Sequence, residues 1–129
     1  MRRFLWVVFM AGCAAPPQGT SEPPAAPPPL PETPIGRETV AIAGLMESAR
    51  NDAAAGRLVQ AAGSLERALR IEPRNPRLWH ELAKVRLRQG DTAQAANLAA
   101  RSNSFAGGDS ALRAANQSII ERARVPGLR

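Results

Sequence analysis

The amino-acid sequence predicts an all-α domain, and three observations support this prediction. From about Arg37 onward alanine is abundant, runs of β-branched residues are absent and tyrosine does not occur, so that helix-forming residues dominate. Glycine and proline interrupt this region at intervals of about one helix length. Between the interruptions, apolar residues recur every three or four positions, which gives each segment one apolar stripe.

The chain begins with the pattern of a secretory signal. Arg2 and Arg3 supply positive charge, and the uncharged run Phe4–Ala11 follows them. This run is too short to span a bilayer, because a spanning helix needs about 20 apolar residues. Residues 1–12 are therefore predicted to be a cleavable signal peptide.

The segment Met10-Ala11-Gly12-Cys13 resembles the lipobox of bacterial lipoproteins, with Met10 in place of the usual leucine. The resemblance implies that Cys13, the only cysteine, becomes the lipidated N-terminus and carries acyl chains such as palmitate. More than one chain gives stable anchoring. Ala14, where an aspartate would favour the inner membrane, implies the outer membrane facing the periplasm. The alternative is an ordinary signal peptide with an incidental cysteine.

Residues 13–36 are predicted to form the lipidated cysteine and a disordered, proline-rich tether. Nine of the twelve prolines lie in residues 14–34, and such a stretch favours polyproline II over helix or sheet. At about 3.1 Å per residue, residues 14–34 could reach roughly 65 Å. We interpret it as a spacer. The alternative, a PxxP docking ligand, fits less well because the domains that recognise such ligands belong mainly to the eukaryotic cytosol.

The folded domain is predicted over residues 37–125. Glycine suits helix C-termini and aspartate suits N-caps, so Gly90-Asp91 and Gly108-Asp109 indicate turns between helices. The predicted helices are residues 37–55, 57–71, 76–89, 92–104 and 110–124. Their apolar stripes include Leu58, Ala62, Leu65 and Leu69; Leu78, Leu82 and Val85; and Leu112, Ala115, Ile119 and Ala123.

The sequence also contains an internal repeat. A shift of 34 residues aligns Gly56 with Gly90 and Ala61 with Ala95, which is a period of helix-turn-helix arrays. The second unit resembles the tetratricopeptide repeat through Trp79, Leu82, Ala83, Gly90 and Ala95. The first unit, residues 42–75, keeps the expected Ala68 and Pro73 but departs from the pattern at Ser48 and Asp52.

The resemblance implies a short array of about two tetratricopeptide repeats with a C-terminal capping helix. Ala61 and Ala95 are expected where paired helices cross closely. The cap needs a polar outer face, which we expect to contain Arg113, Asn116, Gln117, Glu121 and Arg124. Asn103 and Asn116 are expected in turn or capping roles.

In tetratricopeptide proteins the first helix of each repeat lines a binding groove. The resemblance implies that the groove here contains Met46, Arg50, Arg77, His80, Lys84, Leu87 and Arg88. This face is basic with apolar patches, which suits an acidic peptide or a C-terminal carboxylate. The asparagines of the carboxylate clamp in chaperone-binding members are absent from these positions. The alternative is a solvated helix face with no ligand.

Catalytic signatures are missing from the sequence. It contains no GxGxxG, Walker or paired-carboxylate motif, and His80 has no second histidine with which to hold a metal. We therefore expect no catalytic residue, metal or cofactor, and a protein that is not an enzyme. Loss of Arg2 and Arg3 with the signal lowers the net charge from +6 to about +4. Nucleic acid is not an expected partner in the cell envelope.

The sequence thus predicts a membrane-anchored periplasmic lipoprotein whose helical domain is a scaffold or adaptor for an envelope protein or peptide. Lipoproteins of similar design serve secretin or pilus assembly, outer-membrane protein insertion, or peptidoglycan synthases. The alternative is a basic module that binds peptidoglycan or lipopolysaccharide. A third interpretation is a structural component that stabilises a complex through its last helix. The small size of the array also leaves homodimerisation open.

Overall fold

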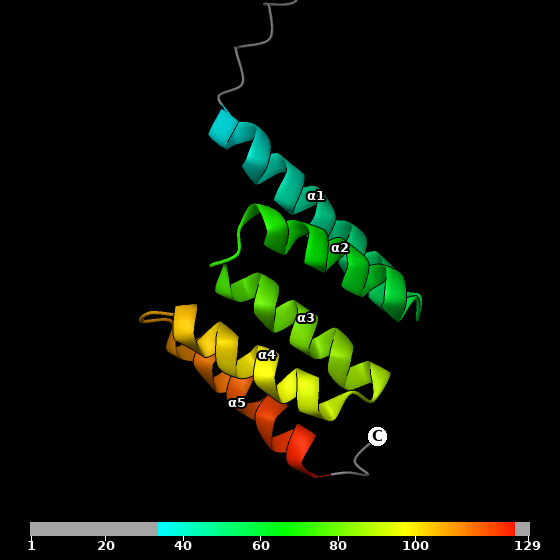
Figure 1. Cartoon of the computed structure of the whole chain (residues 1–129), viewed down its shortest axis with the longest axis vertical. Coiled ribbons are helices and arrows are strands. Elements are labelled where there is room, and N and C mark those ends of the chain that lie inside the picture. Colours follow the sequence, from blue (N-terminus) through cyan, green and yellow to red (C-terminus); the bar gives the residue numbers. More distant parts are fainter. Residues whose placement is uncertain (1–33, 126–129) are drawn as a thin grey trace, which may run out of the picture. The chain divides into compact units, whose positions relative to one another are not determined.

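The computed structural model describes residues 34–125, with side chains from residue 39 onward. Within this range the chain forms five α-helices and no strand: α1 (Pro34–Ala54), α2 (Leu58–Ile71), α3 (Pro76–Gln89), α4 (Thr92–Phe105) and α5 (Ser110–Arg124). Each helix packs on the next, and α3 also contacts α5 (Figure 1). The predicted all-α class is confirmed, and the helix ends lie within three residues of their predicted positions.

The predicted signal peptide, Cys13 and nearly all of the predicted tether lie outside the described residues. The last residues assigned to the tether, 34–36, belong to α1, which begins at Pro34. Proline is compatible with the first turn of a helix because the amide it lacks has no intrahelical partner there. None of the helices described, α1 to α5, is long and apolar enough to cross a membrane.

Short polar side chains begin three of the helices. Asn75 accepts a hydrogen bond from the Arg77 amide at 3.0 Å at the start of α3. Asp91 and Asp109 accept from backbone amides inside the first turns of α4 and α5, at 3.1 and 2.9 Å. These bonds satisfy amides that the helix itself leaves without acceptors. Gly90-Asp91 therefore ends α3 and begins α4, as predicted. At the second pair Asp109 begins α5 as predicted, but α4 already ends at Phe105, before Gly108.

Gly90 ends α3 in the left-handed conformation, with a φ of 86°. Gly90→Ala is expected to lower the free energy of unfolding by about 1 kcal/mol, because an L-residue is strained there. Gly44 lies inside α1, and a Cβ added to it meets no atom within 4 Å. Gly44→Ala is therefore expected to stabilise the domain by up to about 1 kcal/mol. Urea unfolding of both variants measures the two shifts, and shifts of the same sign would contradict the prediction.

The helices bury two adjoining apolar clusters. The first joins α1, α2 and α3 and contains Ile42, Ala49, Ala61, Ala62, Leu65, Ala68, Leu69, Leu78, Leu82 and Val85. The second joins α3, α4 and α5 and contains Ala83, Ala95, Ala99 and Ile119. Ala61 and Ala95 are completely buried in these clusters, as expected for small residues at positions where paired helices pack closely.

Two predictions for α5 are wrong. Asn116 was expected on the polar outer face but is completely buried, and Ala115 was expected in the apolar stripe but is exposed. The reason is that residues 112, 116 and 119 lie on one side of a helix, and Asn116 is hydrogen-bonded there. The other residues expected on the outer face, Arg113, Gln117, Glu121 and Arg124, are exposed as predicted.

Candidate functional site

The helices α1, α3 and α5 share a hollowed face. A pocket of about 140 Å³ lies between α1 and α3. A second pocket of about 250 Å³ extends from these helices to the start of α5. The two pockets have Met46, Arg50 and Glu81 in common. We call them together the groove; its lining consists of Met46, Ala49, Arg50, Ala53, Leu65, Arg77, His80, Glu81, Lys84, Val85, Arg88, Asp109, Ala111 and Leu112.

Six of the seven residues predicted for the groove line it, namely Met46, Arg50, Arg77, His80, Lys84 and Arg88. Leu87 does not, because it packs against the second apolar cluster, between α3 and its neighbours α4 and α5. Leu87 lies one helical turn after the completely buried Ala83, on the same side of α3.

Sequence reasoning missed the residues that α5 contributes to the groove. Asp109, Ala111 and Leu112 line the pocket of about 250 Å³, whereas we expected α5 to act as a cap and did not place it in the groove. A signal for this role exists, because the N-cap Asp109 follows the N-cap Asn75 by 34 residues, one repeat period. The helix α5 therefore occupies the position of the first helix in a third repeat.

The groove has an apolar floor and a positively charged rim. Ala49, Leu65 and Val85 are buried at its base. Four cationic side chains line it, Arg50, Arg77, Lys84 and Arg88, against the two carboxylates of Glu81 and Asp109, which gives a formal charge of +2.

The ion pairs in the groove leave most of the cationic rim accessible. Glu81 lies 2.9 Å from Lys84 Nζ and 3.8 Å from Arg50, and Asp109 lies 4.0 Å from Arg77. The three cationic side chains are at least half exposed, and pairs of this kind contribute about 1 kcal/mol or less. Within the described part of the chain, Arg88 forms no salt bridge. The rim can therefore bind carboxylates of a ligand.

The comparisons with known proteins agree with this geometry. A family model described as "Tetratricopeptide repeat" matches residues 52–119, from the last turn of α1 into α5. The chain belongs to the tetratricopeptide repeat family. It is also similar to a solved structure, the globular C-terminal domain of P. aeruginosa LpoP, with 44% sequence identity and a TM-score of 0.64. The similar region covers 65% of this chain and 79% of that domain. No curated protein is significantly similar to the chain.

In the tetratricopeptide arrangement, α1–α2 and α3–α4 are the two repeats.

A hydrogen-bond network links the second repeat to α5. His80 Nδ1 lies 2.7 Å from Asn116 Oδ1, and Asn116 Nδ2 donates to Ser102 Oγ and to Asn103 Oδ1, both at 2.8 Å. Ser102 Oγ in turn donates to the Pro76 carbonyl at 2.8 Å. Asn116 therefore connects three helices and does not have the turn or capping role that we expected.

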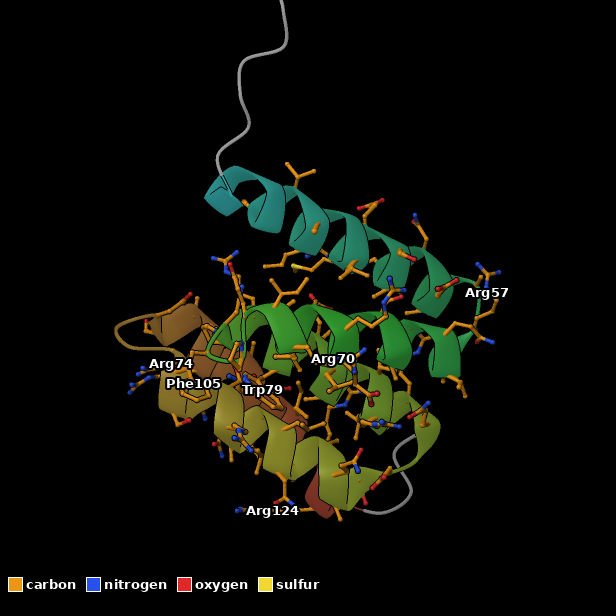
Figure 2. The ribbon with its side chains drawn as sticks, turned by 45° about the horizontal axis from the view of Figure 1, so that its top comes forward. Arg57, Arg70, Arg74, Trp79, Phe105 and Arg124 are labelled. Carbon is orange, nitrogen blue, oxygen red and sulfur yellow. The ribbon has the colours of Figure 1, made fainter. Side chains whose placement is uncertain are left out.

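Two contacts between arginine and aromatic side chains lie outside the groove, and Figure 2 labels three of the residues involved, Arg74, Phe105 and Trp79. The Arg74 guanidinium lies 5.9 Å from the Phe105 ring, and the Arg101 guanidinium lies 4.7 Å from the Trp79 ring. Trp79 Nε1 donates to the Pro73 carbonyl at 2.8 Å. These contacts join the α2–α3 connection to α3 and α4 and have a structural role.

The chemistry of the groove is suited to binding. Among the described residues, no group of three or more His, Cys, Asp and Glu side chains could hold a metal ion. The groove combines guanidinium and ammonium donors with an apolar floor, which are the features that bind an extended acidic peptide.

Proposed function

We propose that the chain is a membrane-anchored periplasmic lipoprotein whose tetratricopeptide domain binds an envelope protein through the groove, as a scaffold or adaptor. The observation that carries the proposal is the groove itself, with its apolar floor and an excess of two positive charges. Electrostatic complementarity favours an acidic partner segment, because like charges facing one another are strongly disfavoured. The partner is therefore an envelope protein with an exposed acidic segment.

The similarity to LpoP supports a shared mode of action. The two sequences are 44% identical, and the similar region covers 79% of that globular domain. We therefore propose that the two domains use the same face for binding. Expression of this chain in P. aeruginosa cells that lack LpoP tests the idea. Recovery of the LpoP-dependent phenotype supports it, and a stably expressed, anchored chain without any recovery would contradict it.

The anchor is part of the proposal. Residues 1–12 act as the signal peptide, Cys13 carries the lipid in the outer membrane, and residues 13–36 hold the domain away from the bilayer. The support is the positive start, the short apolar run and the lipobox-like segment. Labelling with a fatty-acid analogue in wild type and in Cys13→Ser tests the anchor. Equal labelling of the two chains would contradict lipidation at Cys13.

Crosslinking and pull-down of the intact lipoprotein from envelopes tests the groove. A variant with Arg77, Lys84 and Arg88 changed to alanine is expected to recover at least about tenfold less partner. A matched control changes Arg67, Arg113 and Arg122, which are exposed and outside the groove. This control removes the same charge and is expected to retain the partner. Equal recovery by both variants would show that the groove does not bind it.

Glu81→Gln is expected to strengthen binding of the recovered partner about threefold. The change removes the carboxylate that pairs with Lys84 and Arg50, so both cations become available to the ligand. Affinity measurements at low and moderate salt test this, and the gain should shrink as salt increases. Weaker binding by Glu81→Gln at both salt concentrations would contradict an acidic ligand.

Binding of anionic envelope polymers is a second candidate function. It is favoured by the exposed arginines outside the groove, among them Arg67, Arg113 and Arg122. Binding to purified peptidoglycan or lipopolysaccharide should then be lost between low and moderate ionic strength. It should also be insensitive to Met46→Ala, a change in the apolar part of the groove. Binding of an acidic peptide is expected to weaken in this variant.

A further inference from the structure

The network behind the groove determines which nitrogen of His80 carries a proton. The chain of reasoning begins at the Pro76 carbonyl, which can only accept a hydrogen bond. Ser102 Oγ lies 2.8 Å from this oxygen, so the serine hydroxyl must donate to it. The same Oγ is then left as an acceptor for its second partner, Asn116, and the amide nitrogen of Asn116 must face it, at 2.8 Å.

This orientation of the Asn116 amide fixes the next bond. Its nitrogen has a second hydrogen, which is donated to Asn103 Oδ1 at 2.8 Å. Its oxygen therefore faces His80 Nδ1, at 2.7 Å. A carbonyl oxygen cannot donate, so the hydrogen of this bond belongs to Nδ1. In a neutral imidazole with hydrogen on Nδ1, Nε2 is an acceptor with a free lone pair.

The ring nitrogen of His80 that remains for the groove is Nε2, because Nδ1 is bonded to the completely buried Asn116. His80 Nε2 forms no hydrogen bond within the described residues. Among the described residues, Arg86 Nε is the one side-chain nitrogen or oxygen that is both buried and without a hydrogen-bond partner. Because His80 Nε2 also lacks a partner but does not share this property, it is not fully buried. His80 lines the pocket of about 250 Å³ together with Arg50 and Arg77. The pocket thus offers a hydrogen-bond acceptor among cationic donors.

We propose that His80 is a specificity-determining residue of the groove: its Nε2 selects a partner segment with a neutral hydrogen-bond donor, a hydroxyl group, between acidic residues. This inference rests on the proposed function of the groove. When the imidazole is neutral, a carboxylate placed at His80 faces the lone pair of Nε2, whereas a serine, threonine or tyrosine hydroxyl donates a hydrogen bond to it. Neighbouring carboxylates of the same segment pair with Arg50 and Arg77.

The tautomer can be measured without any ligand. His80 is the only histidine in the chain, so the two ring nitrogens of the ¹⁵N-labelled full chain in detergent micelles give unambiguous NMR signals. At mildly alkaline pH we expect a protonated Nδ1 and an unprotonated Nε2. A protonated Nε2, or signals averaged between the two tautomers, would overturn the inference whatever the groove binds.

The recognition role can be measured with a random peptide library displayed on phage and selected on the full chain. Wild type is expected to select acidic peptides that contain a serine, threonine or tyrosine at one preferred position. His80→Asn keeps an amide nitrogen near the position of Nδ1, for the bond to Asn116, but has no acceptor near Nε2. It is expected to keep the acidic preference and to bind a selected hydroxyl peptide about fivefold more weakly.

Two controls make the result specific. The alanine analogue of the selected peptide is expected to bind wild type and His80→Asn equally. His80→Gln, whose longer side chain can place its amide oxygen near the position of Nε2, is expected to retain the hydroxyl preference. An acidic preference with no hydroxyl preference in wild type overturns the role of His80 alone. Absence of any acidic preference overturns the proposed function of the groove instead, so the acidic preference itself distinguishes the two failures.

Discussion

Asn116→Ala is expected to lower the free energy of unfolding by about 3 kcal/mol. The side chain is completely buried and makes three hydrogen bonds, to His80, Ser102 and Asn103. Its removal leaves these partners unsatisfied in or near the core and creates a cavity between α4 and α5. For a domain of this size, the thermal midpoint should fall by more than about 10 °C. Thermal and urea unfolding measure both quantities.

Gln117→Ala is the matched control for this prediction. Gln117 is the next residue of α5, is exposed and bonds only to Glu121 on the same helix, at 3.2 Å. Its loss is expected to change the free energy of unfolding by less than about 0.5 kcal/mol. Similar shifts for the two variants would mean that Asn116 does not connect the helices in the way described.

Leu78→Ala is expected to destabilise the domain by about 2–5 kcal/mol. Leu78 is completely buried in α3, in the apolar cluster that joins α1, α2 and α3. Its truncation removes packing contacts within this cluster, and a closely packed core refills such a space only in part. Val59→Ala on α2, where the side chain is 73% exposed, is expected to have an effect of less than about 0.5 kcal/mol. Equal stability of the two variants would contradict the assignment of this core.

The helices could be predicted from the sequence because the turns are encoded locally. Gly90-Asp91 supplies a left-handed glycine and an N-cap aspartate at adjacent positions, and each acts within a few residues. The start of α1 was less accurate. Pro34 continues the composition of the preceding proline-rich stretch, and proline is allowed in a first helical turn, so composition does not mark this boundary.

The errors inside the helices have a different cause. Asn116 was placed on the surface by residue type, whereas Leu87 was placed in the groove by its position in the tetratricopeptide pattern. In the structure each follows its helical position, because Asn116 shares a side with Leu112 and Ile119, and Leu87 follows Ala83. A buried asparagine becomes predictable only when its partners are known, and Ser102 and Asn103 lie on another helix.

The groove was predicted in part because repeat position determines which side of α1 and α3 faces it. The contribution of α5 was missed because its sequence lacks the repeat's aromatic and leucine pattern, although its N-cap keeps the 34-residue period. The pairing of charges between helices was also beyond the sequence. Glu81 and Lys84 are three residues apart on α3, whereas the distance of 3.8 Å between Glu81 and Arg50 depends on how closely α1 packs beside α3.

The central claim is that the face shared by α1, α3 and α5 binds the partner, and site-directed photo-crosslinking tests it most directly. Met1 and Met10 lie in the predicted signal peptide, so Met46, which lines both pockets, is the only methionine of the mature chain. Incorporation of a photoreactive methionine analogue therefore marks the groove alone.

The control chain carries Met46→Leu and Val59→Met, which moves the photoreactive side chain to an exposed position on α2 outside the groove. Both purified mature chains are mixed with unlabelled envelopes and irradiated. We expect position 46 to crosslink an envelope protein with an acidic segment, and position 59 not to crosslink it. Capture of that protein from position 59 and not from position 46 would contradict the account.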